Sequence, residues 1–115
     1  MEYINFVSLV NNFAEYFSRK NLEGISALLH ENFILEDPVF KRLEGKDKMI
    51  NILQEQFEKT KNVSYDIINL YQTNNTSIVE FKISFDELIL NGVDFMEWEN
   101  EKIKELRCYY NSPAI

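Results

Sequence analysis

The first half of the chain carries apolar residues at helical spacing. They recur three and four positions apart until Ser18-Arg19-Lys20 breaks the pattern, which predicts a first amphipathic helix. Its apolar stripe consists of Tyr3, Phe6, Val10, Phe13 and Phe17. Asn21 is a suitable N-cap for a second, shorter helix with Ile25 and Leu28 on its apolar face. A third helix is predicted over 46–61, buried through Met49, Leu53 and Phe57.

A short strand is expected between the second and third helices. Phe33-Ile34-Leu35 is an apolar run, and Asp37-Pro38 ends it, because proline has no backbone donor and keeps the residue before it extended. Residues 39–45 are expected to form a loop.

The second half of the chain has the pattern of strands. Residues 77–85 alternate between apolar and polar side chains, which is typical of a strand with one buried face. Further strands are predicted over 63–72, 88–98 and 103–110, separated by short polar turns. Helices followed by consecutive strands indicate one α+β domain over 1–115, with the helices on one face of an antiparallel sheet.

Composition and charge narrow the class of protein. Twelve basic against 19 acidic residues give a net charge of -7, which argues against nucleic acid and against anionic membranes as partners. Cys108 is the single cysteine, so no internal disulfide is possible. The N-terminal residues lack a basic segment and a long apolar run, so we expect no signal peptide, no transmembrane segment and a cytoplasmic protein.

Two carboxylates stand in otherwise apolar strands. Asp94 shares a strand face with Gly92, Met96 and Trp98, so an inward-facing strand would bury it. Such burial raises the pKa of a carboxyl group, because desolvation disfavours the charged form. Asp37 is placed at the end of its short strand, near the rim of the same interior.

Each of these residues also has a purely structural interpretation. Asp37 is equally suited to ending a strand and starting a turn. Asp94 can be a structural acid bonded to Tyr16, or an exposed residue if the strand register slips by one position. Tyr16, on the apolar side of its helix, can be a core tyrosine with a satisfied hydroxyl.

Three segments together resemble the SnoaL-like and ketosteroid isomerase-like proteins of the nuclear transport factor 2-like superfamily. They are Tyr16 followed by Asn21-Leu22-Glu23-Gly24-Ile25, then Leu35-Glu36-Asp37-Pro38, then 92–98 with 102–110. The resemblance implies a cone-shaped, strongly curved antiparallel sheet of about four strands plus a short one, packed on three helices. It also implies an apolar ligand pocket.

The resemblance further implies a catalytic set. Asp37 corresponds to the base of the ketosteroid isomerases, and Tyr16 and Asp94 correspond to the donors that hold the enolate oxygen. The pocket around them is expected to be lined by further residues: Phe13, Leu53, Phe57, Phe81, Phe85, Met96, Trp98, Cys108 and Tyr110. We expect no cofactor and no metal.

Two functions are compatible with this interpretation. In one, the protein binds a small apolar organic molecule and isomerises it by proton abstraction next to a carbonyl. In the other, it is a non-catalytic ligand-binding or protein-association module of the same fold. In both, we expect a homodimer through the outer sheet face, where Val93, Phe95, Arg107 and Tyr109 should lie.

Overall fold

The computed structural model describes residues 5–111 and contains three helices. They are α1 (Val7–Ser18), α2 (Leu22–Leu28) and α3 (Lys46–Lys59). The Asn21 side chain accepts a hydrogen bond from the Gly24 backbone N–H and so caps α2, as predicted. Tyr3, which was assigned to the first apolar stripe, lies outside the described residues. None of the helices in residues 5–111 has the length and apolar character needed to cross a bilayer.

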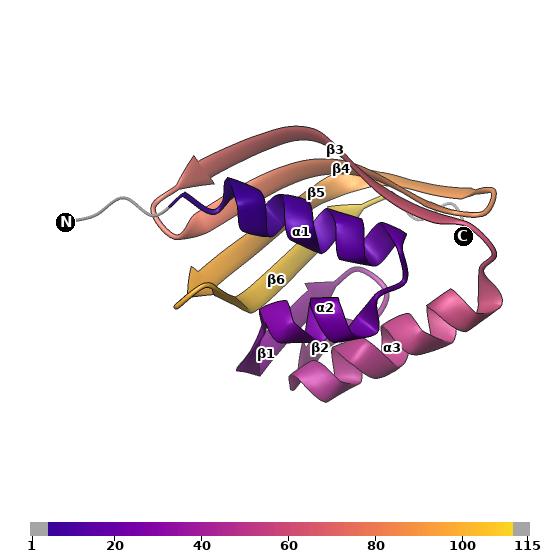
Figure 1. Cartoon of the computed structure of the whole chain (residues 1–115), viewed down its shortest axis with the longest axis horizontal. Helices are drawn as coiled ribbons and strands as arrows, with labels where there is room; N and C mark the ends of the chain where they lie inside the picture. The colour runs from indigo at the N-terminus through magenta and orange to yellow at the C-terminus, as the bar shows by residue number, and fades with distance from the viewer. Residues whose placement is uncertain (1–4, 112–115) are drawn as a thin grey trace.

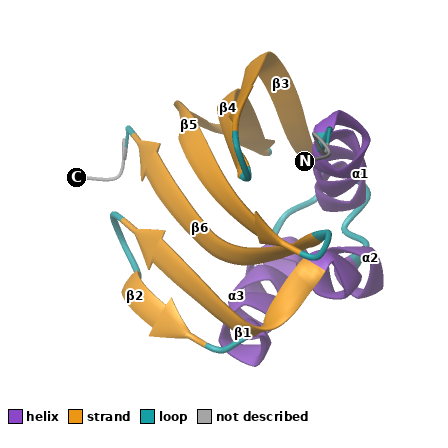
Figure 2. Cartoon of the chain, turned by 90° about the vertical axis from the view of Figure 1, so that its left-hand side faces the viewer, coloured by secondary structure: helices purple, strands orange, loops and turns teal. Residues whose placement is uncertain are grey.

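Six strands form a single curved sheet that packs against the helices (Figures 1 and 2). In chain order they are β1 (Leu29–Asp37), β2 (Lys41–Glu44), β3 (Val63–Thr73), β4 (Thr76–Phe85), β5 (Leu88–Glu99) and β6 (Lys102–Tyr110). Their order across the sheet is β2-β1-β6-β5-β4-β3. The predicted α+β fold, with helices gathered on the concave side of the sheet, is therefore confirmed.

Two details of the predicted sheet are wrong. The stretch expected to be a loop contains the edge strand β2, which pairs with β1 from Ile34↔Glu44 to Asp37↔Lys41. The sheet is mixed rather than antiparallel, because β1 runs parallel to β6. A helix-containing crossover separates the two strands in sequence, which is what a parallel pair requires.

The concave face carries the alternating apolar residues predicted for β4. Val79, Phe81 and Ile83 are buried, and Glu80 and Lys82 between them are exposed. On β5 the same alternation buries Asp94, Met96 and Trp98, so the inward register predicted for Asp94 is confirmed. The core thus lies between this face and the helices.

At one end of the curved sheet the core contains a pair of stacked aromatic rings. Phe6 stacks on Trp98 with ring centroids 4.9 Å apart, and the Trp98 indole N–H donates to Ser77 Oγ at 2.9 Å. Toward the other end of the sheet, the interior opens into a pocket.

Candidate functional site

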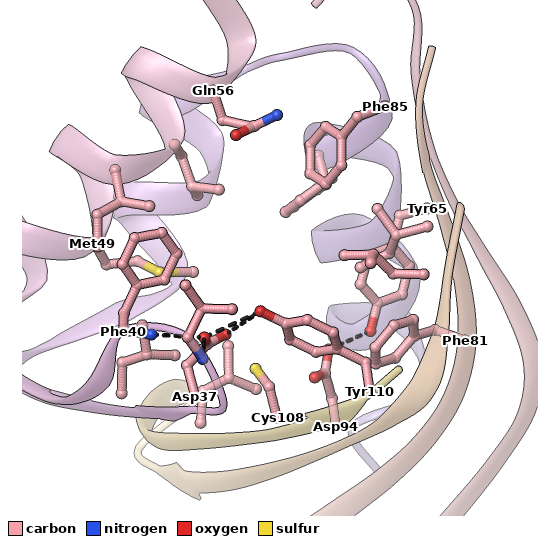
Figure 3. Close-up of a pocket in the computed structure, with 18 of the residues that line it drawn as sticks. Asp37, Phe40, Met49, Gln56, Tyr65, Phe81, Phe85, Asp94, Cys108 and Tyr110 are labelled. Atoms are coloured by element: carbon pink, nitrogen blue, oxygen red, sulfur yellow. Dashed lines mark hydrogen bonds between the residues drawn. The ribbon is translucent and has the colours of Figure 1, made fainter. Parts of the chain in front are cut away.

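A pocket of about 260 Å³ lies between the concave sheet face, α1 and α3 (Figure 3). Most of its lining is apolar: Phe13, Phe17, Leu35, Val39, Phe40, Met49, Ile52, Leu53, Phe81, Ile83, Phe85, Leu88, Leu90 and Leu106. Its polar lining is small: Asp37, Gln56, Tyr65, Asp94, Cys108 and Tyr110. Val39, Phe40 and Leu88 are exposed, and they mark the mouth.

Asp94 enters the pocket from the middle of β5 and is 3% exposed. Tyr65, on β3, donates its hydroxyl proton to Asp94 Oδ2 at 2.6 Å. Both residues face inward because Tyr65 pairs with Ile83 on β4 and Asp94 pairs with Val79, and these two β4 residues share the concave face. The aromatic partner of Asp94 therefore comes from the sheet itself.

The second oxygen of Asp94 has no partner. Oδ1 is buried and accepts no hydrogen bond within the described part of the chain. Desolvation raises the Asp94 pKa to about 6, an effect that the Tyr65 hydrogen bond and the Cys108 thiol oppose. The negative charge of Asp37 raises this pKa further. Asp94 thus changes protonation state close to neutral pH.

Asp37 lies at the end of β1 and is held by protein donors. Its Oδ2 accepts hydrogen bonds from the backbone N–H groups of Val39 and Phe40, at 2.7 and 3.0 Å. Tyr110, on β6, donates to the same carboxylate at 3.0 Å (Figure 3). These bonds fix the carboxylate at the wall of the pocket, as an Asx-type turn does.

Cys108 lies on β6 between the two acidic groups, and Figure 3 draws its sulfur among the side chains of Asp37, Asp94 and Tyr110. Burial raises the pKa of this thiol well above its ordinary value, and the charge of Asp94 raises it further. The thiol is therefore protonated at neutral pH and is a weak nucleophile.

Tyr16 does not reach the pocket. Its ring packs against Gly24 of α2 so closely that a Cβ added to this glycine would lie 2.6 Å from the Tyr16 ring. The structure corrects the expected convergence of Tyr16 on Asp94, because Tyr65 takes that position. The sequence does hold a signal for Tyr65, which shares its strand face with Val63 and Ile67. The pairing across strands that brings it to Asp94 is not legible in the sequence.

Six of the nine residues predicted to surround the site line the pocket: Phe13, Leu53, Phe81, Phe85, Cys108 and Tyr110. The other three, Phe57, Met96 and Trp98, are buried elsewhere in the core. Phe57 packs edge-on against Phe17, and Trp98 stacks on Phe6. The correct strand face was identified, but which part of that face stays open depends on how the helices cross it.

Metal binding finds no support in residues 5–111, where no three His, Cys, Asp or Glu side chains gather as ligands. His30, the single histidine of the sequence, lies on β1. Its Nε2 is 2.7 Å from Glu99 Oε2, and its Nδ1 accepts the Asn32 backbone N–H.

Several solved structures share this fold. An NTF2-like protein of unknown function from Cytophaga hutchinsonii is 21% identical, with a TM-score of 0.80 over 96% of this chain and 93% of its own. A protein with a ketosteroid isomerase-like fold from Catenulispora acidiphila, in complex with trimethylamine, is 14% identical. Its TM-score is 0.77, over 90% of this chain and 85% of its own.

An LEH-like epoxide hydrolase from M. tuberculosis also superimposes on the chain. It is 15% identical, with a TM-score of 0.77 over 91% of this chain and 81% of its own. At these identities the three structures establish the fold alone. The sequence has no significant match among curated proteins.

Family membership follows from the sequence itself. The profile of the SnoaL-like domain matches residues 10–106, which is most of the chain and includes Asp37, Tyr65 and Asp94. The match agrees with the three segments that carry the resemblance and with the nuclear transport factor 2-like fold of the structural neighbours. The chain belongs to the SnoaL-like domain family.

Proposed function

We propose that the protein binds a small, largely apolar organic molecule in this pocket and transfers a proton on it, as ketosteroid isomerase-like proteins do. The observation that carries the proposal is the pair of carboxyl groups, Asp37 and Asp94, in the lining of one apolar pocket. They have different surroundings, which is how proteins assign acid and base roles to like residues. The volume of about 260 Å³ is just below the range of about 300–1,000 Å³ typical of drug-sized ligands, so it favours a compact ligand.

In this proposal Asp94 holds the polar atom of the ligand through Oδ1, and Tyr65 keeps the carboxyl group in position through Oδ2. Asp37 is the base, fixed beside the ligand by Tyr110 and two backbone N–H groups. When the polar atom is a carbonyl oxygen, Asp94 acts in its protonated form and donates a hydrogen bond as negative charge develops.

The alternative is a non-catalytic binding module of the same fold. The specific observation that favours it is the number of donors on Asp37, because Val39, Phe40 and Tyr110 together occupy both of its oxygens. A carboxylate satisfied in this way can serve the turn alone. The trimethylamine complex of the Catenulispora acidiphila protein is compatible with either function, since it concerns binding only.

An isomerisation assay separates the two functions. The substrate is a small cyclic β,γ-unsaturated ketone, and the ultraviolet absorbance of the conjugated product reports turnover. We expect Asp37→Asn to lower kcat by roughly 10²–10⁴-fold, the usual contribution of a general base. Asp66→Asn removes the same charge from the exposed outer face of β3 and should leave kcat unchanged. Turnover that survives Asp37→Asn, or no turnover although the ketone binds, would favour the non-catalytic module.

A further inference from the structure

The charged groups of the pocket are all acidic. Asp37 and Asp94 both belong to its lining, and no Lys, Arg or His is found among the lining residues in the described part of the chain. The hydroxyls of Tyr65 and Tyr110 already donate to these two carboxyl groups. Gln56, drawn across the pocket from Asp37 in Figure 3, is neutral. The pocket therefore has negative charge without a counterion of its own.

The buried oxygen Oδ1 of Asp94 also favours a ligand that can donate a hydrogen bond. Among residues 5–111, Asp94 Oδ1 has no hydrogen-bond partner, although Asp94 is only 3% exposed. A buried carboxylate oxygen without a donor is costly, by several kcal/mol for a fully desolvated charge, and native proteins normally satisfy such groups. A ligand that supplies both a donor and a positive charge would relieve this cost at one point.

The neighbouring titratable groups respond to the same negative charge. Burial raises the pKa values of Tyr65, Cys108 and Tyr110, and the charge of Asp94 raises all three further. The charge of Asp37 also raises the pKa values of Cys108 and Tyr110. The part of each shift that comes from the carboxylate charges, unlike the larger part that comes from burial, also favours a positive charge on a ligand. These three residues and the two carboxyl groups are the titratable groups of the pocket lining.

The walls suit a cation with an apolar body. Phe13, Phe40, Phe81, Phe85 and Tyr110 all line the pocket, so aromatic rings form part of the same wall as the acidic groups. A protonated nitrogen is attracted to the face of an aromatic ring by about 0.5–2 kcal/mol, more when it is desolvated. Hydrocarbon next to that nitrogen would contact the remaining apolar lining.

We infer that the ligand of this pocket is a compact apolar molecule with one protonated amine, whose N–H group donates to Asp94 Oδ1. The inference rests on the proposed function, because it requires that the pocket bind a small organic molecule. It specifies that the polar atom held by Asp94 is an ammonium nitrogen. Asp37 adds a second negative charge to the same space.

Isothermal titration calorimetry at pH 7.5 with matched probes tests this inference. The probes are 2-phenylethylamine, 2-phenylethanol, phenylacetone and phenylacetate, which share a ring and differ in the polar group. We expect the amine to bind at least tenfold more tightly than the alcohol or the ketone, and the acid to bind most weakly. An alcohol or ketone that binds as tightly as the amine overturns the inference and leaves the proposed function standing. No binding by any probe at millimolar concentration contradicts both.

Two variants test whether Asp94 causes the preference for the amine. Asp94→Asn should remove the tenfold advantage of the amine over the alcohol. Asp66→Asn, which lowers the net negative charge equally at an exposed position on β3, should keep that advantage. A preference for the amine that persists in Asp94→Asn would refute the role given to Asp94.

The pH dependence of the wild-type protein gives a second test that needs no variant. Because the Asp94 pKa is about 6, lowering the pH from 7.5 to 5 should weaken amine binding by about tenfold. The affinity for the alcohol should change little over the same range. Amine affinity that is constant across this range would overturn the inference, even if Asp94→Asn failed to fold.

Discussion

Asp94 combines full burial with an incomplete set of hydrogen bonds. Its pKa rises from 3.8 to about 6, because desolvation outweighs the stabilising bond from Tyr65. Each pKa unit corresponds to about 1.4 kcal/mol, so an ionised Asp94 costs the empty folded protein on the order of 3 kcal/mol. Such a cost at a pocket wall is typical of functional sites rather than of structural acids.

The first prediction concerns stability against pH. The folded state binds the Asp94 proton more tightly than the unfolded state, so its contribution to stability is complete below about pH 4 and is lost as the pH rises through about 6. Relative to wild type, Asp94→Asn should therefore gain about 2 kcal/mol in unfolding free energy between pH 4 and pH 7. Urea unfolding followed by Trp98 fluorescence measures this difference, and a difference independent of pH would contradict the assignment.

A second prediction concerns the effect of the Tyr65 hydroxyl on the pKa of Asp94. The Tyr65 hydroxyl lowers the pKa of Asp94 through its hydrogen bond, so Tyr65→Phe should raise that pKa above about 6. Carbon-13 NMR of the Asp94 carboxyl group measures the midpoint directly. Tyr71→Phe removes a hydroxyl from an exposed tyrosine of the same strand and should leave the midpoint unchanged. A midpoint that falls or stays constant in Tyr65→Phe would show that the bond does not stabilise the ionised form.

The sequence predicted the acids of the site better than their partners. Strand alternation was sufficient to predict that Asp94 is buried. The proline after Asp37 was sufficient to predict that β1 ends there. The tyrosines depend on contacts between distant elements. Tyr65 meets Asp94 only through the β3, β4 and β5 pairing, and Tyr110 meets Asp37 only because β6 lies beside β1. No local pattern specifies either neighbour.

At the scale of elements, the backbone of β6 lies directly against Gly92 of β5. A Cβ at this position would lie 2.1 Å from the Tyr109 carbonyl oxygen and 2.8 Å from the Tyr110 Cα, which are both backbone atoms. The missing side chain therefore leaves room for β6 at the point where Tyr110 turns toward Asp37.

The third prediction concerns the substitution of Gly92. Gly92→Ala should destabilise the protein by about 1–3 kcal/mol, because neighbouring backbone atoms cannot move aside as a side chain can. Gly24→Ala is the matched control and should cost less, since the three atoms nearest to its added Cβ belong to the Tyr16 side chain, which can move more readily than backbone. Thermal unfolding of the two variants compares them. Equal losses of stability would mean that the close approach at Gly92 has no special role.

Element boundaries differed from the prediction where burial is weak. β2 was missed because three of its four residues are exposed and only Leu43 is partly buried, so it lacks an alternating signal. β1 was placed correctly but begins earlier than predicted, directly after α2, because its first residues pair with Ile103 of β6. The long strands β3, β4 and β5 were predicted almost to their ends, because short polar turns bound them.

At the scale of the whole molecule, the outer face of the sheet carries an aromatic patch around Tyr109. Tyr109 is 56% exposed and contacts the Phe95 ring, over which the Arg107 guanidinium lies at 5.4 Å. Tyr71 and Ile78 continue the patch across β3 and β4. Exposed aromatic patches of this kind commonly mark association surfaces. We propose that two copies of the chain pair through this face.

The fourth prediction concerns the proposed dimer. Sedimentation equilibrium at micromolar concentration should give a dimer, and Tyr109→Glu should give a monomer with unchanged circular dichroism, because it places a charge at the centre of the patch. Gln54→Glu adds the same charge on the exposed side of α3 and should remain a dimer. A monomeric wild-type protein would refute the proposal.

The parallel pairing of β1 with β6 also has a consequence for folding kinetics. The hydrogen bond between Tyr110 and Asp37 joins residues 73 positions apart. The chain between them must lose conformational entropy before this contact forms and offsets the loss. The hairpins of β3, β4 and β5 involve much shorter separations. A partly folded chain that has formed this meander but not yet docked β6 on β1 contains most of the sheet and lacks the wall that holds Asp37. Binding competence should therefore appear later in refolding than sheet formation.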